Sequence, residues 1–119
     1  MTKPESPLNM RALDELRASV GDDPVFVAEL IDDFVTEAPR QLEILREAAA
    51  TGEAESARRA AHTLKGNART FGAEGLASLC LEVETAAAAG DLEVVRQQLS
   101  SVEAEWSRVR EALVAFQAP

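Results

Sequence analysis

The sequence predicts an all-α protein, an antiparallel up-and-down four-helix bundle with an additional short helix at its N-terminal end. Alanine and leucine are abundant, whereas only 4% of the residues are aromatic and only six are glycine, a composition that favours packed helices over a sheet. Apolar residues recur at helical spacing in the long segments between glycines, and no segment alternates like a strand. At 119 residues, the chain is expected to form one domain around one core.

The N-terminal part predicts a tail followed by a short helix. Residues 1–7 are polar and contain two prolines, so we expect a flexible tail before a single helical domain over 8–119. A first helix is expected over about 9–19, and Gly21 ends it.

The second helix begins with a clear capping signal. Asp22 or Asp23 can accept hydrogen bonds from its first N–H groups, and Pro24 fits its first turn, where a missing N–H is tolerated. Pro39 falls inside the same apolar run, and we expect it to kink the helix or to split it near Ala38.

Glycines divide the rest of the chain into three further helices, expected over about 53–70, over about 73–89 and from 92 onward. Gly72 is a plausible C-cap, and Gly90 opens a turn. Four long helices with short links favour antiparallel neighbours, and the first short helix is expected to cover one end of the bundle. The last helix carries the most regular apolar repeat, formed by Leu92, Val95, Leu99, Val102, Trp106, Val109, Leu113 and Phe116.

Charge and composition exclude several kinds of partner. The net charge of −9 argues against a nucleic-acid partner, which needs a dense cationic face, and against anionic membranes. No apolar run approaches the roughly 20 residues that span a bilayer, and residues 1–7 lack the apolar centre of a signal peptide. The single cysteine, Cys80, cannot form an internal disulfide, so the expected location is cytoplasmic.

The only histidine, His62, is the main candidate for chemistry. Gly66 follows it by four residues, so on a helix it lies over the same spot and leaves the imidazole open. Lys65 places a cation beside the ring. An open imidazole beside a positive charge suits a group that accepts and releases an anion such as a phosphoryl group. The same helix carries a partly exposed basic stripe, formed by Arg58, His62, Lys65, Gly66 and Arg69. This basic stripe is one residue out of register with an apolar stripe of Ala57, Ala61, Leu64, Ala68 and Phe71.

Other roles for His62 are less well supported. A lone histidine is most often a structural residue at the edge of a core. A metal site would need further convergent ligands, and the chain has no second histidine, so no metal is expected. Cys80 falls on the apolar face of its helix, where a buried and inert thiol is the ordinary interpretation.

The sequence around His62 resembles the histidine-containing phosphotransfer (HPt) domains of two-component phosphorelay signalling. The resemblance extends from about Leu13 to the last helix. The matching residues are Ala61-His62-Thr63-Leu64-Lys65-Gly66, then Gly72, Leu76, Leu79-Cys80 and Glu82, and, in the second helix, Asp22-Asp23-Pro24, Glu29-Leu30-Ile31 and Phe34.

The resemblance implies a function and a set of partners. Nε2 of His62 would accept a phosphoryl group from an aspartate of a response-regulator receiver domain, including those of hybrid histidine kinases, and pass it to another receiver. Lys65 would offset the phosphate charge, and Gly66 would let the receiver come close. The Mg²⁺ for transfer would lie on the receiver, so this chain would bind no cofactor. It has no Gly-x-x-x-x-Gly-Lys loop, so we expect a phosphocarrier, not a kinase.

Docking is expected to combine an apolar patch around His62 with charges on its rim. Arg58, Arg69 and Phe71 are the candidates, although Arg58 can equally pair with Glu55 or Glu53, and Phe71 can equally belong to the core. HPt domains more often have a small residue where this chain has Arg69. A monomer is the simplest expectation for a relay that docks different receivers in turn.

Two alternative functions remain open at this point. The chain could be a helical protein-binding module in which His62 is never phosphorylated. It could also be a phosphoacceptor domain that the catalytic domain of a histidine kinase phosphorylates directly.

Overall fold

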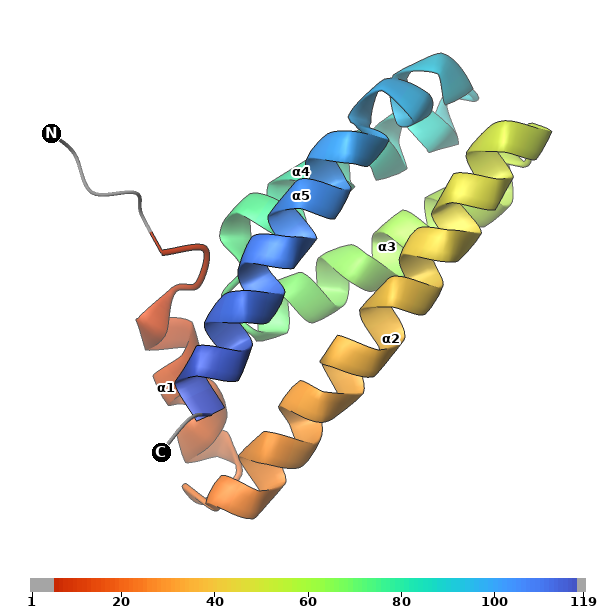
Figure 1. Ribbon diagram of the computed structural model, residues 1–119. Coiled ribbons are helices and arrows are strands. Elements are labelled where there is room, and N and C mark those ends of the chain that lie inside the picture. The colour runs from red at the N-terminus through yellow and green to blue at the C-terminus, as the bar shows by residue number, and fades with distance from the viewer. Residues whose placement is uncertain (1–5, 118–119) are drawn as a thin grey trace, which may run out of the picture.

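The computed structural model describes residues 6–117, and within that range the chain is all-α, with no strand. Residues 1–5 of the expected tail lie outside the described residues. None of the described helices is long and apolar enough to cross a membrane. The predicted fold class is confirmed, and the helices are α1 (Met10–Ser19), α2 (Pro24–Thr51), α3 (Ala54–Thr70), α4 (Glu74–Ala88) and α5 (Leu92–Gln117) (Figure 1).

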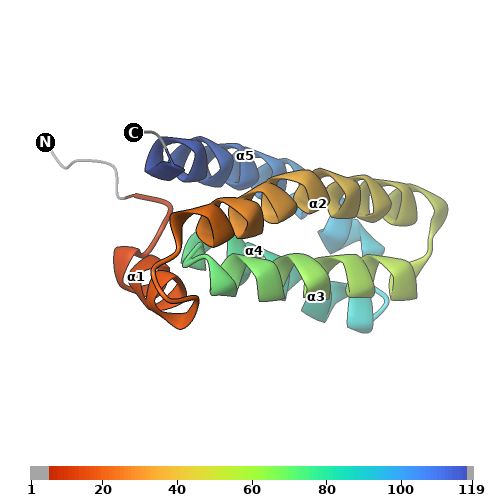
Figure 2. The same cartoon turned by 90° about the horizontal axis from the view of Figure 1, so that it is seen from below.

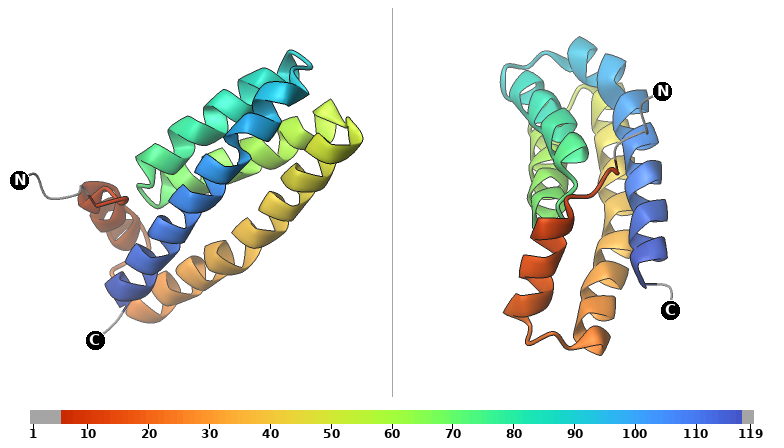
Figure 3. Two further views of the ribbon diagram at one scale, coloured as in Figure 1. Left: turned by 45° about the horizontal axis from the view of Figure 1, so that its top comes forward. Right: turned by 90° about the vertical axis from the view of Figure 1, so that its left-hand side faces the viewer.

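The four long helices form a closed bundle of two layers. Each of them packs against its neighbour in the chain, and α5 also packs against α2, which closes the bundle. In Figure 2, α2 and α5 form one layer and α3 and α4 form the other. The first pair has 28 and 26 residues, whereas the second has 17 and 15. The layer of α3 and α4 is therefore shorter, and α1 occupies the end that it leaves uncovered (Figures 2 and 3).

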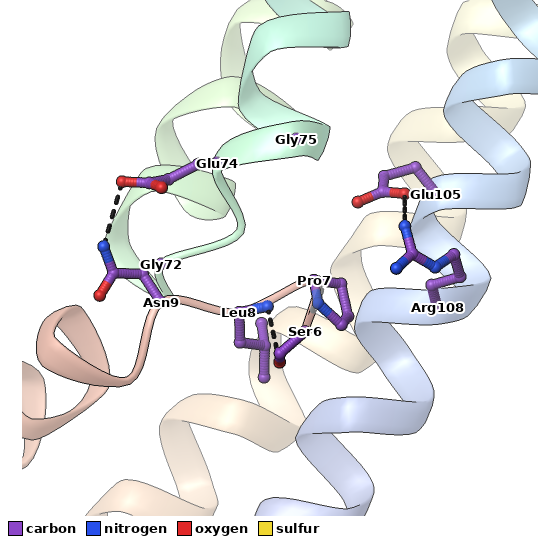
Figure 4. A pocket seen from close by; sticks show the side chains of 9 residues that line it. All are labelled: Ser6, Pro7, Leu8, Asn9, Gly72, Glu74, Gly75, Glu105 and Arg108. Carbon is purple, nitrogen blue, oxygen red and sulfur yellow. Dashed lines mark hydrogen bonds and ion pairs between the residues drawn. The ribbon is translucent and has the colours of Figure 1, made fainter. Parts of the chain in front are cut away.

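Asn9 fixes α1 to the turn between α3 and α4. Its side-chain oxygen caps α1 by accepting hydrogen bonds from the first backbone N–H groups of the helix. Its own backbone N–H donates to the carbonyl of Gly72 at 2.7 Å, and its Nδ2 donates to Glu74 at the start of α4 at 3.2 Å (Figure 4). Asn9 thus caps α1 and joins it both to the turn between α3 and α4 and to the first residue of α4.

Gly72 is the glycine that this junction requires. Its φ is +73°, a conformation that side chains disfavour, and a Cβ placed there would lie 2.7 Å from the carbonyl oxygen of Asn9 and 2.9 Å from Cβ of Ala12. Phe71 occupies the C-cap position of α3, and Gly72 follows it, which confirms the predicted glycine stop.

Helix α2 excludes one of the two outcomes predicted at Pro39. Asp23 caps the helix as expected, but the helix then continues unbroken from Pro24 to Thr51 through the proline. The prediction of a split near Ala38 was wrong. Pro39 lies on the exposed side of α2, where water can satisfy the carbonyl that loses its helical partner, while buried residues on both sides hold the helix to the bundle.

An aromatic cluster joins the two layers near α1. The ring of Phe34 stacks on Phe71 with centroids 4.8 Å apart and meets Trp106 edge-on at 5.0 Å. Both are favourable aromatic geometries. Trp106 is buried, as the inward stripe of the last helix predicts. Around the cluster, leucine, valine and alanine fill one continuous core.

Replacing Gly72 with alanine is expected to destabilise the fold by about 2–4 kcal/mol, because a left-handed conformation and a steric overlap with Asn9 add together. Urea unfolding followed by circular dichroism measures this loss. Gly52→Ala is the matched control, since Gly52 also has a positive φ but open space around a Cβ. Equal losses in the two variants would show that contact with α1 contributes nothing.

Candidate functional site

Helix α3 presents His62 halfway along its length. The predicted apolar stripe of this helix is buried throughout, so α3 is held firmly between α2 and α4. The side chain of His62 stands just outside that stripe and is 62% exposed. The imidazole is therefore carried by a rigid element and remains reachable from solvent.

A carboxylate from α4 holds the imidazole in place. Oε2 of Glu84 lies 2.9 Å from Nδ1 of His62, and Oε1 of the same carboxylate lies 2.6 Å from Nζ of Lys65. Oε1 is itself fully buried. Glu84 therefore bridges the two side chains of α3, and the three groups form one cluster at the junction of α3 and α4.

The environment of Lys65 corrects one part of the prediction. The sequence placed it on a partly exposed basic stripe, as a cation beside the imidazole. In the structure its side chain is only 11% exposed, and its ammonium is paired with Glu84. A charge this deep is tolerated because its partner is close. That partner is Glu84, to which the sequence pattern assigned no role.

The cluster keeps Glu84 ionised. The Lys65 ammonium, and to a lesser degree the His62 ring, hold the pKa of the Glu84 carboxyl below its ordinary value, although burial acts in the opposite direction. Arg58 adds a further positive charge near this carboxylate. At neutral pH Glu84 is therefore a carboxylate that can only accept hydrogen bonds.

This assignment determines which nitrogen of His62 is free. Because an ionised carboxylate cannot donate, Nδ1 must carry the proton in their hydrogen bond. In the neutral ring, Nε2 then holds the lone pair. With the ring largely exposed, the site offers a nucleophilic nitrogen of fixed orientation.

The surface beside His62 is open at Gly66. This glycine is exposed, and a Cβ placed on it would meet no atom within 4 Å. A side chain at position 66 would therefore extend into open space.

The three predicted docking residues have different environments. Arg58 forms hydrogen bonds to Glu55 at 2.6 and 3.0 Å, the ordinary pairing that the sequence left open. Arg69 is exposed. Phe71 is only 5% exposed and stacks on Phe34, so it belongs to the core and presents no ring to a partner.

Cys80 has the inert environment that its sequence position predicts. It is buried, and burial raises the pKa of its thiol to about 12. Within residues 6–117, no group of three or more histidine, cysteine or acidic side chains is arranged to hold a metal ion.

Glu84 did leave a signal in the sequence. It follows buried Cys80 by four residues and precedes buried Ala87 by three, so it lies at the margin of the apolar stripe of α4. A carboxylate at such a position predicts a buried cationic partner. The sequence could not predict that α4 packs against α3 in a register that places Glu84 next to His62.

A helical bundle that presents one oriented and accessible imidazole is typical of a phosphocarrier domain. The family model of the Hpt domain matches residues 29–112. The chain therefore belongs to the Hpt domain family.

Two solved structures are similar over almost the whole chain. Histidine-containing phosphotransfer protein B (HptB) from Pseudomonas aeruginosa PAO1 is 30% identical, with a TM-score of 0.85, and the match covers 96% of each chain. The HPT domain of the Hpt sensor hybrid histidine kinase from Shewanella is 18% identical, with a TM-score of 0.73 and 93% of each chain covered, and supports the fold alone. None of the curated proteins matches the chain in sequence.

The family determines the general function of the chain, which is histidine phosphotransfer in a phosphorelay. Hpt domains are phosphocarrier modules and not kinases, and they interact with receiver domains.

The ion pairs of Glu84 predict a loss of stability at acidic pH. Its pKa is lower in the folded chain than the ordinary 4.5, so its contribution is complete above that pH and disappears as the pH falls through the folded value. Glu84→Gln is expected to lower the free energy of unfolding by about 2 kcal/mol at pH 7, and the difference should shrink toward pH 3. Urea unfolding at both pH values measures this. Glu82→Gln, at an exposed position of the same helix, is the control, and a difference independent of pH would contradict the assignment.

Proposed function

We propose that Nε2 of His62 is the phosphoryl acceptor of this domain. The observation that carries the proposal is the hydrogen bond between Nδ1 and Glu84, because in the neutral ring it leaves the lone pair on Nε2, and the ring is largely exposed. His62 is also the only histidine of the chain, and histidine phosphotransfer is the function of its family.

The transfer step needs no proton to leave the ring. The Nε2 lone pair attacks the phosphorus of an aspartyl phosphate on a receiver domain. The bond between phosphorus and the aspartyl oxygen breaks, and the receiver carboxylate leaves with that electron pair. The phosphorylated ring keeps its Nδ1–H and carries a positive charge. Transfer onward to a second receiver is the same step in reverse.

The partners proposed are receiver domains of response regulators, including those of hybrid histidine kinases. Because the reaction in the receiver uses Mg²⁺ and acidic side chains, this domain would supply only the nucleophile and would bind no cofactor. We further propose that it works as a monomer in the cytoplasm and lacks kinase activity of its own. The absence of a nucleotide-binding loop from the sequence supports the last point.

The proposed docking surface surrounds His62. Gly66 provides the space that a receiver loop needs, since nothing occupies the position of its missing side chain. Arg58 and Arg69 lie on the rim, and they would meet the acidic surroundings of the receiver's phosphorylation site. Charges on a rim chiefly raise association rates and select partners.

His62→Gln is expected to abolish phosphate uptake from a labelled receiver in the presence of Mg²⁺, while the bundle stays folded by circular dichroism. The wild-type label should be labile in acid and stable in base, as a phosphohistidine is. Label that persists on the variant would place the acceptor elsewhere. No label on folded wild type from a broad panel of receivers would favour a protein-binding module that is never phosphorylated.

Gly66→Leu is expected to block transfer from a receiver without lowering stability, because leucine favours a helix over glycine by nearly 1 kcal/mol and the position is open. Phosphotransfer rates and urea unfolding, measured on the same samples, separate the two effects. Ala50→Leu, at an exposed position of α2, controls for a bulky surface residue. A normal transfer rate in Gly66→Leu would contradict the role of Gly66 in access.

A further inference from the structure

We propose that Arg58 contacts the phosphoryl group that His62 carries. The role of Arg58 rests on the proposed function and deepens it, because it names the group that offsets the phosphoryl charge between two transfers. Lys65 is not available for this role, since its ammonium is paired with Glu84 and its side chain is only 11% exposed. The remaining cations of α3 are Arg58, Arg59 and Arg69.

Arg58 lies one turn before His62, on the side that faces α4. Successive residues of an α-helix are about 100° apart, so Arg58 and Lys65 are displaced from His62 by about 40° and 60° in the same direction. The pairing of Lys65 with Glu84 shows that α4 lies in this direction. Helical side chains also lean toward the N-terminus of their helix, which tilts the imidazole toward the turn that carries Arg58.

The other two arginines of α3 are less well placed. Arg59 is displaced from His62 by about 60° in the opposite direction. Its side chain is 75% exposed, whereas that of Arg58 is 35% exposed and therefore lies closer to the protein surface. Arg69 lies about 10 Å beyond His62 along the helix axis, on the side away from which the imidazole leans.

Glu55 holds the guanidinium of Arg58 by one edge. Its carboxylate accepts hydrogen bonds from Nε at 3.0 Å and from Nη2 at 2.6 Å. Nη1 makes no hydrogen bond to residues 6–117, so its two N–H groups remain for phosphoryl oxygens. The pKa of Arg58 is raised by its hydrogen bond to Glu55 and also by the charge of Glu84. The guanidinium therefore lies within electrostatic range of the carboxylate that contacts His62.

The contact between Arg58 and the phosphoryl group is expected to be weak, which suits a carrier. The side chain of Arg58 is partly exposed, and Glu55 competes for its charge. Its attraction for a phosphoryl group therefore resembles that of a surface ion pair. Such a contact offsets part of the phosphoryl charge in the resting domain and does not trap the group when a receiver docks.

Phosphorus-31 NMR of the phosphorylated domain tests this contact in the absence of a receiver. Phosphoramidate labels the wild type and the variant Arg58→Gln: Nε2 of His62 attacks phosphorus, the P–N bond breaks, and ammonia leaves. A nearby cation favours the more highly charged form of a phosphoryl group and lowers the pH midpoint of its titration. Arg58→Gln is therefore expected to raise that midpoint by about half a pH unit, as the loss of a surface ion pair would.

Arg59→Gln is the matched control, because it removes the same charge from a neighbouring residue that also pairs with Glu55. Its midpoint is expected to stay close to that of the wild type, and circular dichroism should show both variants folded. Equal midpoints in Arg58→Gln and Arg59→Gln would overturn the proposal, because a contact specific to Arg58 must separate the two.

The guanidinium itself provides a second readout. Nitrogen-15 NMR of the wild type before and after labelling is expected to show a change in the Nη1 signals of Arg58 and none in those of Arg59. Unchanged Arg58 signals on a labelled domain would overturn the role of Arg58 and leave the proposed function intact. A folded wild type that takes no label on His62 would contradict the proposed function itself, and the role of Arg58 with it.

Discussion

The close packing of α3 against α4 is the constraint on which the site depends. The buried faces of these two helices are rich in alanine, including Ala57, Ala61, Ala77 and Ala87, and small side chains let helix backbones approach. Because the helices are close, one carboxylate on α4 reaches two side chains of α3. A wider separation would leave Glu84 and Lys65 as unpaired charges at the edge of the core, which is energetically unfavourable.

The same packing holds His62 on a rigid helix while its imidazole stays exposed to solvent. The apolar stripe of α3 fixes the helix, Glu84 holds the ring at Nδ1, and most of the His62 side chain remains exposed. Helix α1 completes the scaffold at the end of the shorter layer, where Asn9 binds the turn that terminates α3. Access at His62 therefore does not depend on a mobile segment within the described residues. Under the proposed function, Nε2 of His62 would reach a partner without any rearrangement of the bundle.

Most of the fold could be predicted from the sequence, because helix periodicity and glycine stops are local properties. The continuity of α2 through Pro39 could not, since it depends on which side of the helix the proline faces and on packing by distant residues. The exposed positions of His62 and Gly66 were predictable from spacing within one helix. The pairing of Lys65 with Glu84 was not, because it joins residues of two helices, and their relative height is set by the whole bundle. Phe71 was ambiguous for a similar reason, as only its contact with Phe34 of another helix places it in the core.

The charge balance of the cluster bears on how a carrier should work. A group that bound phosphate tightly would stabilise the phosphorylated state and slow the onward step, since binding that is equal in the ground state and the transition state does not accelerate transfer. Lys65 is largely buried and forms an ion pair with Glu84. The net charge of this pair is therefore close to zero, and an incoming phosphoryl group would meet no free lysine charge there. Under the proposed function, the hydrogen bond from Nδ1 to Glu84 would keep the ring oriented in both directions of transfer. The domain would then contribute an oriented nucleophile, while the electrostatic stabilisation of the moving phosphoryl group would come from the receiver.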